Sequence, residues 1–217
     1  MKGLYIVVEG GDGTGKGTLI SGLAERIRST PLFRKLVLIS EPGSGSIGPE
    51  IKRILDTKKV APLTQLFLFL AARAQIVREI ILPAINSGKV VLSDRSFLSS
   101  IAYQVFGGGM SKSLVKSLSF IALGDVRPDL AIILDIDPEI GLARVRARGE
   151  GITPFEQEKL DYHRRVREGY LALAKDNPEK TLVIDATLPA EEVLNTAFDK
   201  IHGRLISHKT KKEEGEK

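Results

Sequence analysis

The sequence predicts an α/β protein built on a parallel sheet of five strands with helices on both faces. Short β-branched runs alternate with longer helical patterns, which is typical of βαβ units. The strand candidates are near-continuous apolar runs, as expected for strands that are covered on both sides. With 217 residues, 42% of them hydrophobic, the chain can bury a core without disulfides. We expect one globular domain over residues 1–205 and a charged, disordered tail over 206–217.

The elements follow one another regularly along the chain. The predicted strands are residues 4–9 (LYIVVE), 35–40 (KLVLIS), 89–93 (KVVLS), 130–136 (LAIILDI) and 181–185 (TLVID). The predicted helices are residues 16–29, 48–57, 63–87, 97–105, 111–122, 138–147, 155–175 and 190–203. Ligands bind beyond the carboxyl ends of the strands in open parallel sheets. The residues that follow each strand are therefore the candidates for a site.

Composition excludes several classes of function. The chain has no cysteine, so it has neither a thiolate metal site nor a cysteine nucleophile. The net charge is +5, but 27 acidic residues are interspersed among 32 basic ones, and no basic stripe with aromatic residues suggests nucleic-acid binding. The N-terminal apolar run is short and ends at Glu9, so it predicts neither a secretory signal nor a membrane span. We expect a cytoplasmic protein without a nucleic-acid or membrane partner.

A glycine-rich segment, GGDGTGKGT, follows the first strand and precedes the first helix. Glycines let backbone N–H groups turn inward, and the helix N-terminus adds its positive end, so the segment predicts a nucleotide phosphate site. Lys16 adds a point charge for the β- and γ-phosphates. The predicted nucleotide-binding residues are Gly10, Gly11, Asp12, Gly13, Thr14, Gly15, Lys16, Gly17 and Thr18.

The position after Lys16, where a magnesium-binding hydroxyl is expected, holds Gly17. A carboxylate can hold Mg²⁺ through water instead, because the ion keeps much of its hydration shell. Asp94, directly after the third strand, is the predicted metal residue. A GKGT ending also resembles the loop of adenylate kinases, in which glycine at this place is normal.

Four further segments give a specific resemblance. Residues 41–53 (EPGSGSIGPEIKR), 66–75 (LFLFLAARAQ), 82–104 (LPAINSGKVVLSDRSFLSSIAYQ) and 127–149 (RPDLAIILDIDPEIGLARVRARG) together resemble bacterial thymidylate kinases, over residues 5 to about 201. The resemblance implies the P-loop nucleoside monophosphate kinase fold with a mobile lid, here residues 147–156. It implies the reaction of dTMP with ATP to give dTDP, in dTTP biosynthesis with Mg²⁺, and a homodimer.

Residue roles follow from the resemblance. Phe69 is expected to stack on thymine, and Arg73, one helical turn further, to bond the base. Ser100 and Gln104 match further base-side positions, Tyr103 the residue beside the sugar, and Asp12 the carboxylate that contacts the 3′-hydroxyl. Taken alone, Phe69 is more often a core residue than a stacking one, Tyr103 suits packing as well as ligand contact, and Ser100 suits capping its own helix.

The same resemblance assigns the acceptor phosphate to Arg95, whose fork suits bidentate contact. Glu41 matches a site carboxylate for metal, water or sugar. Arg53 matches a second phosphate-binding arginine, but the segment carries one extra residue relative to the family's spacing, so Lys52 is the alternative.

The acceptor phosphate is largely ionised near neutral pH, so catalysis becomes a matter of charge neutralisation by Lys16, Arg95, lid arginines and magnesium. Arg148 is our first candidate in the lid and Arg146 the second. The lid departs from its relatives: RGEGITPFE stands where RGELDRIE is usual. Glu156 and Glu158 are expected mainly to favour a helix N-terminus.

Two other functions remain open at this stage. Ser96 stands where thymidylate kinases usually have an aromatic residue or histidine, and DRS with EP also occurs in deoxynucleoside kinases. Such an enzyme phosphorylates a 5′-hydroxyl, with Glu41 as general base. The altered lid also suits a non-catalytic nucleotide-binding regulatory module, although Lys16, Asp94 and Arg95 argue for catalysis.

Overall fold

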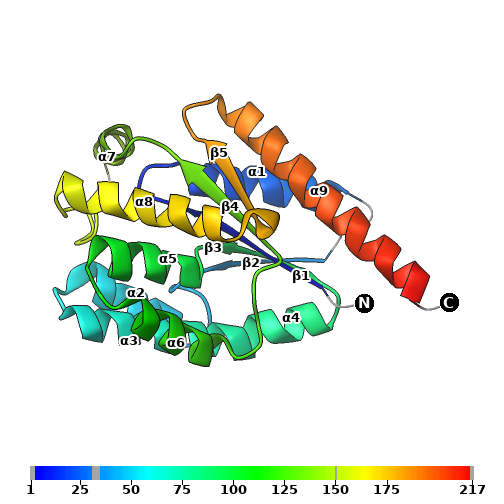
Figure 1. The fold of residues 1–217 in the computed structure, drawn as a ribbon, viewed down its shortest axis with the longest axis horizontal. Helices are drawn as coiled ribbons and strands as arrows, with labels where there is room; N and C mark the ends of the chain where they lie inside the picture. The colour runs from blue at the N-terminus through cyan, green and yellow to red at the C-terminus, as the bar shows by residue number, and fades with distance from the viewer. Residues whose placement is uncertain (1–2, 31–34, 150, 216–217) are drawn as a thin grey trace.

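A computed structural model describes residues 3–30, 35–149 and 151–215 of the chain. Within them lies a sheet of five parallel strands in the order β2-β3-β1-β4-β5 (Figure 1). The strands are β1 (Leu4–Gly10), β2 (Leu36–Ser40), β3 (Val90–Asp94), β4 (Leu130–Asp135) and β5 (Thr181–Asp185). The five predicted strands are thus confirmed, and their ends differ from the predicted ones by at most one residue.

Helices surround this sheet. They are α1 (Lys16–Ser29), α2 (Gly48–Thr57), α3 (Pro62–Ile76), α4 (Leu82–Asn86), α5 (Phe97–Ser100), α6 (Lys112–Leu123), α7 (Pro138–Ala147), α8 (Leu160–Asp176) and α9 (Ala190–Gly215). The segments η2 (Val77–Ile81) and η3 (Ile101–Gly107) are π-helical, and η4 (Pro178–Lys180) is a 3₁₀ turn. The predicted helices 16–29, 48–57 and 138–147 have the observed bounds.

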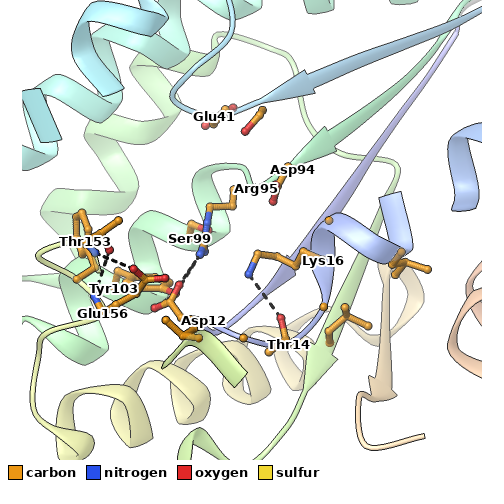
Figure 2. A pocket seen from close by; sticks show the side chains of 18 of the residues that line it. Asp12, Thr14, Lys16, Glu41, Asp94, Arg95, Ser99, Tyr103, Thr153 and Glu156 are labelled. Carbon is orange, nitrogen blue, oxygen red and sulfur yellow. Dashed lines mark hydrogen bonds and ion pairs between the residues drawn. The ribbon is translucent and has the colours of Figure 1, made fainter. Parts of the chain in front are cut away.

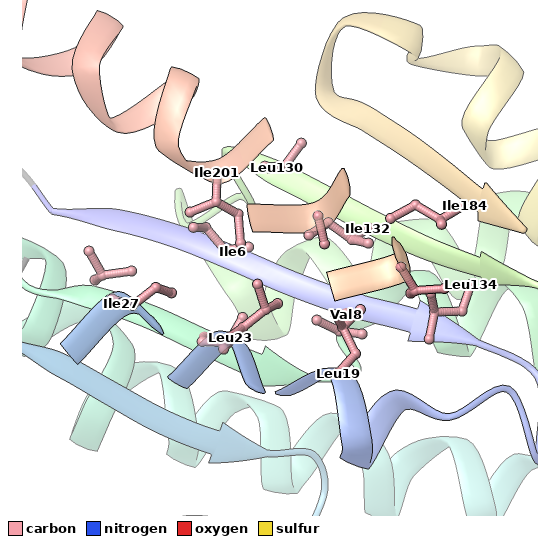
Figure 3. Close-up of a cluster of buried hydrophobic side chains, with 14 of the residues drawn as sticks. Ile6, Val8, Leu19, Leu23, Ile27, Leu130, Ile132, Leu134, Ile184 and Ile201 are labelled. Atoms are coloured by element: carbon pink, nitrogen blue, oxygen red, sulfur yellow. The ribbon is translucent and has the colours of Figure 1, made fainter. Parts of the chain in front are cut away.

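The first sheet face is covered by α1 and α9. Apolar side chains of these two helices meet alternate residues of β1, β3 and β4 in one cluster (Figure 3). In α1, Leu19, Leu23 and Ile27 recur at helical spacing and are all buried, which is why this stretch forms an amphipathic helix against the sheet. This packing places the N-terminus of α1 at the carboxyl end of β1.

The remaining side chains of each strand point to the opposite face of the sheet, because successive side chains of a strand alternate between the two faces. Tyr5 and Val7 of β1 pack here against η2, α4 and the end of α6. Further along the sheet, Ile133 packs with η3 and with Val166 and Tyr170 of α8. Segments η3 and α8 touch closely: a Cβ on Gly107 would lie 2.7 Å from the Tyr162 ring.

The predicted helix 63–87 is interrupted, which differs from our expectation. It consists of α3, the π-helical η2 and α4. Pro83 has no backbone N–H, so a regular α-helical ladder cannot continue through it, and the π-helical turn lies immediately before it. The predicted helix 97–105 likewise passes from α5 into η3.

The last helix also extends beyond its predicted end at residue 203. Helix α9 continues to Gly215, so residues 206–215 of the tail that we expected to be disordered are helical in this structure, and 216–217 lie outside the described residues. Lysine and glutamate, which dominate this stretch, are good helix formers. Among the described helices, none has the length and apolar character that crossing a membrane requires.

Candidate active site

A cleft of about 1190 Å³ opens at the carboxyl ends of β1, β2, β3 and β4. It brings together most of the residues that the sequence predicted for a site. The predicted residues that line it are Asp12, Gly13, Thr14, Gly15, Lys16, Gly17, Thr18, Glu41, Phe69, Arg73, Asp94, Arg95, Ser100, Tyr103, Gln104 and Arg148.

The glycine-rich loop forms one wall of the cleft. Gly13 has a φ of 73°, and a Cβ there would lie 1.9 Å from the carbonyl oxygen of Gly141, so only glycine fits. Gly15 caps α1 in a left-handed conformation and provides no capping side chain. The first N–H groups of α1 therefore remain available to an anion at the positive end of the helix.

Lys16 begins α1 and turns back over this loop. Its Nζ donates hydrogen bonds to the carbonyl oxygens of Gly10 (3.2 Å) and Gly11 (2.7 Å), and lies near Thr14 Oγ1, as Figure 2 shows. The Thr14 hydroxyl donates to Gly11 O at 3.0 Å, so it closes the loop. The loop thus holds a cation and a set of amide dipoles in one place.

Arg95 enters the cleft from the end of β3. Its φ of 72° is left-handed, an uncommon and costly conformation for a residue with a side chain. The guanidinium Nη2 donates to Asp12 Oδ1 at 3.0 Å and to the Tyr103 hydroxyl at 3.2 Å. Tyr103 in turn donates to Asp12 Oδ2 at 3.0 Å. Figure 2 shows Arg95 directed toward Asp12, which belongs to the phosphate loop.

Arg73 and Glu41 form a buried ion pair on the other side of the cleft. Arg73 Nε donates to Glu41 Oε2 at 2.8 Å, and its Nη2 donates to Ser96 O and to Ser100 Oγ, both at 3.1 Å. Burial raises the pKa of Glu41, while the charge and hydrogen bond of Arg73 lower it in part. Arg73 Nη1 and Glu41 Oε1 are buried and have no hydrogen-bond partner among the residues that the structure describes.

Three aromatic rings close the space beside Arg73. Phe155, from the segment after α7, lies with its ring centroid 6.0 Å from those of both Phe69 and Tyr103. These three rings and the Arg73 guanidinium all line the cleft, and we call this part of the lining the aromatic slot. A planar, polar ligand fits such a slot.

Comparison with known proteins decides the family. A family description, "Thymidylate kinase", matches residues 8–197. A thymidylate kinase of Chlamydia trachomatis serovar D is 42% identical over 206 residues, which are 93% of this chain and all of that relative. The chain belongs to the thymidylate kinase family.

Other similarities agree with this membership. A thymidylate kinase of Kosmotoga olearia is 41% identical over 192 residues, covering 88% of this chain and 91% of the relative. A crystal structure of thymidylate kinase from Ehrlichia chaffeensis matches with a TM-score of 0.75 and 28% identity, covering 93% of this chain and 99% of the other. The predicted fold, a five-stranded parallel sheet flanked by helices, is thereby confirmed.

Some residues expected from the thymidylate kinase resemblance lie elsewhere. Arg53 of α2 is exposed and does not line the cleft, whereas its neighbour Lys52 does. The stem of Lys52 lies over Gly43, since a Cβ on that glycine would be 3.2 Å from Lys52 Cδ, and its ammonium pairs with Asp56. Lys52, the alternative that the sequence left open, is therefore the basic residue of this pair that lines the cleft.

The two arginines that were predicted for the lid also differ in position. Arg148 lines the cleft and pairs with Glu156 at 3.0 Å, while Arg146 is exposed and lies outside the lining. Glu156 also accepts the Thr153 N–H at 2.8 Å, and Thr153 Oγ1 accepts the Glu156 N–H at 3.3 Å. These reciprocal bonds are those of a capping box, but the turn stops there and α8 begins at Leu160, not at the predicted 155. Residue 150 lies outside the described part.

Sequence reasoning missed four residues of the site region: Glu9, Ser99, Phe155 and Tyr170. Phe155 is an aromatic residue in an otherwise glycine-rich and polar lid, and that signal could have found it. Glu9 and Tyr170 are 161 residues apart yet hydrogen bonded, so no local pattern relates them. Ser99 was one serine among several in DRSFLSS.

Asp94 fits the magnesium expected of a thymidylate kinase. Its Oδ1 is buried without a hydrogen-bond partner in the described residues, at the end of β3 beside the phosphate loop. No described group of three or more His, Cys, Asp or Glu side chains forms a metal cage. Magnesium bound by one carboxylate, phosphates and water needs no such cage.

Proposed function

We propose that this thymidylate kinase transfers the γ-phosphoryl group of ATP to dTMP, with the glycine-rich loop and Lys16 holding the donor and Arg95 holding the acceptor phosphate. The observation that carries the proposal is that Lys16 and Arg95 line one cleft and are joined through the phosphate loop: Arg95 Nη1 donates to Gly10 O, which also accepts from Lys16. Two cationic groups so connected can hold two phosphates against each other.

No general base is required for this step. The acceptor phosphate is largely ionised near pH 7, so one of its oxygens can attack directly. The barrier comes from bringing two polyanions into line, and the fixed amides and cations of the cleft offset that repulsion. Asp94 is placed to hold a hydrated magnesium ion, which would neutralise phosphate charge when bound.

The aromatic slot accounts for choice of base. Arg73 Nη1 is a buried donor without a partner in the described region, so it can donate to a thymine carbonyl. Phe69 lines the slot, where a ring can stack on the base. A base that left this donor unpaired would bind less well. Tyr103 and Asp12, held to each other and to Arg95, are assigned to the deoxyribose.

The single domain with a lid over residues 147–156 remains part of the proposal, as does a cytoplasmic location. A homodimer is also proposed. Helices α3 and α6 pack side by side, and each carries exposed apolar residues: Leu63 and Phe67 on α3, Leu114 and Ile121 on α6. A second copy that packs on these residues would remove them from water. The mass of the protein in solution, measured by light scattering, tests this part.

A coupled assay with ATP, magnesium and dTMP tests the function. We expect ADP formation that depends on dTMP; formation at background level would remove the enzyme assignment. The same assay with thymidine tests the deoxynucleoside kinase alternative, in which Glu41 takes a hydroxyl proton. Family membership and the ion pair of Glu41 with Arg73 favour dTMP.

Lys16 leads to a prediction about proton uptake. Burial, helped by the Arg95 charge, lowers the pKa of Lys16 to about 8 against the opposing pull of Asp12, Asp94 and Glu9. Bound phosphate restores the charged form, so ATP binding at pH 8 is expected to take up about half a proton, since a group titrating near that pH is half protonated. Calorimetry in two buffers of different ionisation enthalpy measures the uptake. Titration with dTMP is the control, and an ATP enthalpy that does not depend on the buffer would contradict the prediction.

Arg148 is predicted to act on the transferred phosphate. Arg148→Ala is expected to lower kcat about a hundredfold with little change in the KM for dTMP, because its charge matters most in the transition state. Steady-state kinetics with each substrate varied in turn measure the two constants. Arg146→Ala is the matched variant, two residues away and outside the cleft lining. If it lowers kcat more than Arg148→Ala does, the role belongs to Arg146.

A further inference from the structure

Directly before the phosphate loop lies a buried carboxylate that the proposed function does not use. Glu9, the penultimate residue of β1, has no exposed surface. It accepts hydrogen bonds from Ser96 Oγ at 2.6 Å, Ser99 Oγ at 2.6 Å and the Tyr170 hydroxyl at 3.0 Å. A buried charge is costly unless it is paired, yet no cation of the described residues lies within ion-pair distance of Glu9.

Two of these three hydroxyls also contact Arg95. Its Nη1 donates to Ser99 Oγ at 3.2 Å and to the Tyr170 hydroxyl at 3.3 Å. Each hydroxyl has one proton and two lone pairs. Ser99 Oγ and the Tyr170 hydroxyl also lie 2.8 Å apart, so their two protons serve three contacts. With Ser99 donating to Glu9, and Tyr170 donating to Glu9 and Ser99 together, lone pairs are left for the guanidinium. The carboxylate thereby sets the direction of both hydroxyl dipoles, and their negative ends face Arg95.

Arg95 needs such support because its backbone is in a left-handed conformation. On its other edge, Nη2 contacts Asp12 and Tyr103, which we assign to the sugar of the substrate. The Glu9 side therefore holds the guanidinium through hydroxyls to which we assign no contact with the substrate. Burial raises the pKa of Glu9, while the serine hydrogen bonds and then the Arg95 charge lower it in part.

We propose that Glu9 is a positioning residue for Arg95, which orients the guanidinium toward the acceptor phosphate through the hydroxyls of Ser99 and Tyr170. The inference rests on the proposed function of Arg95. It also gives a role to Ser96, one of the positions at which the sequence is expected to depart from the family pattern. The hydroxyl of Ser96 donates to Glu9 and accepts the Leu98 N–H at 3.2 Å, so it both supports the carboxylate and caps α5.

Glu9→Gln tests the proposal while keeping the size of the side chain. A glutamine amide donates through nitrogen, so it cannot accept all three hydroxyl protons, and one hydroxyl loses its direction. We expect kcat/KM for dTMP to fall about tenfold to a hundredfold, which corresponds to one hydrogen bond to a charged group. The KM for ATP should change less than about twofold, because Lys16 keeps its contacts.

A double-mutant cycle separates positioning from support of the fold. If Glu9 acts through Arg95, then Glu9→Gln in an Arg95→Ala background should change kcat/KM for dTMP, the same quantity, by less than about twofold. A full tenfold loss in that background would overturn the proposal. If the wild-type enzyme is active and the Glu9→Gln variant has the same kcat/KM for dTMP, the positioning role of Glu9 is overturned and the proposed function stays intact. Absence of dTMP kinase activity in the wild type would instead remove the proposed function itself.

Two further variants keep the test decisive if Glu9→Gln does not fold. Ser99→Ala and Tyr170→Phe each remove one relay hydroxyl and leave Glu9 in place. Each is expected to lower kcat/KM for dTMP several-fold, by about the net value of one hydrogen bond. Ser119→Ala is the matched control: Ser119 is fully buried in α6, outside the cleft lining, and its Oγ has no described partner. Equal kinetics of Ser99→Ala, Tyr170→Phe and Ser119→Ala would contradict the relay.

Discussion

Arg95→Ala is expected to lower kcat/KM for dTMP about a thousandfold, the largest catalytic effect of any single change in this cleft apart from the phosphate loop. The guanidinium bonds both Asp12 and Tyr103, the two residues that we assign to the sugar. Its loss removes charge from the place where the acceptor phosphate must approach a second polyanion. Steady-state kinetics with dTMP varied at saturating ATP measure the effect.

Variants at the same position distinguish charge from geometry. Arg95→Lys keeps a charge but loses the planar fork, so an intermediate loss is expected. Arg95→Gly suits the left-handed backbone, and it should be as inactive as Arg95→Ala while being better tolerated by the fold. Arg127→Ala is the control, because Arg127 also bonds carbonyl oxygens but lies outside the cleft lining. A loss of activity in Arg127→Ala equal to that in Arg95→Ala would contradict the assignment.

Arg73→Ala is expected to have the largest effect on stability, about 3 to 5 kcal/mol of unfolding free energy, because it leaves Glu41 buried without a counter-charge. The side chains of Arg73 and Glu41 are 2% and 4% exposed, so Glu41 has little contact with water that could offset the lost partner. The KM for dTMP should rise far more than the KM for ATP. Urea denaturation gives the stability, and kinetics give the two constants.

The double variant Arg73→Ala with Glu41→Gln separates the two roles of Arg73. Removing the stranded charge should restore at least about 1 kcal/mol of stability. It should not restore binding of dTMP, since the donor to the base is still missing. Equal increases in KM for dTMP and ATP would show that Arg73 does not belong to the base pocket. A stable single variant would show that Glu41 finds another partner.

The sequence predicted the framework of this site well, for local reasons. Asp94 ends one apolar strand, and Lys16 follows the glycine-rich loop at the end of its neighbour; parallel strands bring such ends to one edge. The helical spacing of Phe69 and Arg73 placed both in the cleft. The choice between Lys52 and Arg53 could not be made from the sequence, because adjacent residues of an α-helix point about 100° apart and only the packing of α2 decides which faces the cleft.

What the sequence could not provide were contacts between distant elements. The hydroxyls around Glu9 come from the end of β3, from α5 and from α8, and their convergence depends on packing of η3 against α8. Pro83 could have indicated that the predicted helix 63–87 is interrupted, but the long apolar pattern on both sides of it favoured one continuous helix. The lid was hard to predict because its capping box, Thr153 with Glu156, forms a turn that does not become a helix.

Phe155 connects the predicted lid to the aromatic rings that line the cleft. It belongs to the same short connection as Arg148, yet its ring rests on Phe69 and Tyr103. A movement of this connection would therefore also uncover the rings of Phe69 and Tyr103. A small molecule that binds beneath the Phe155 ring would then hold Arg148 and the proposed base pocket at the same time.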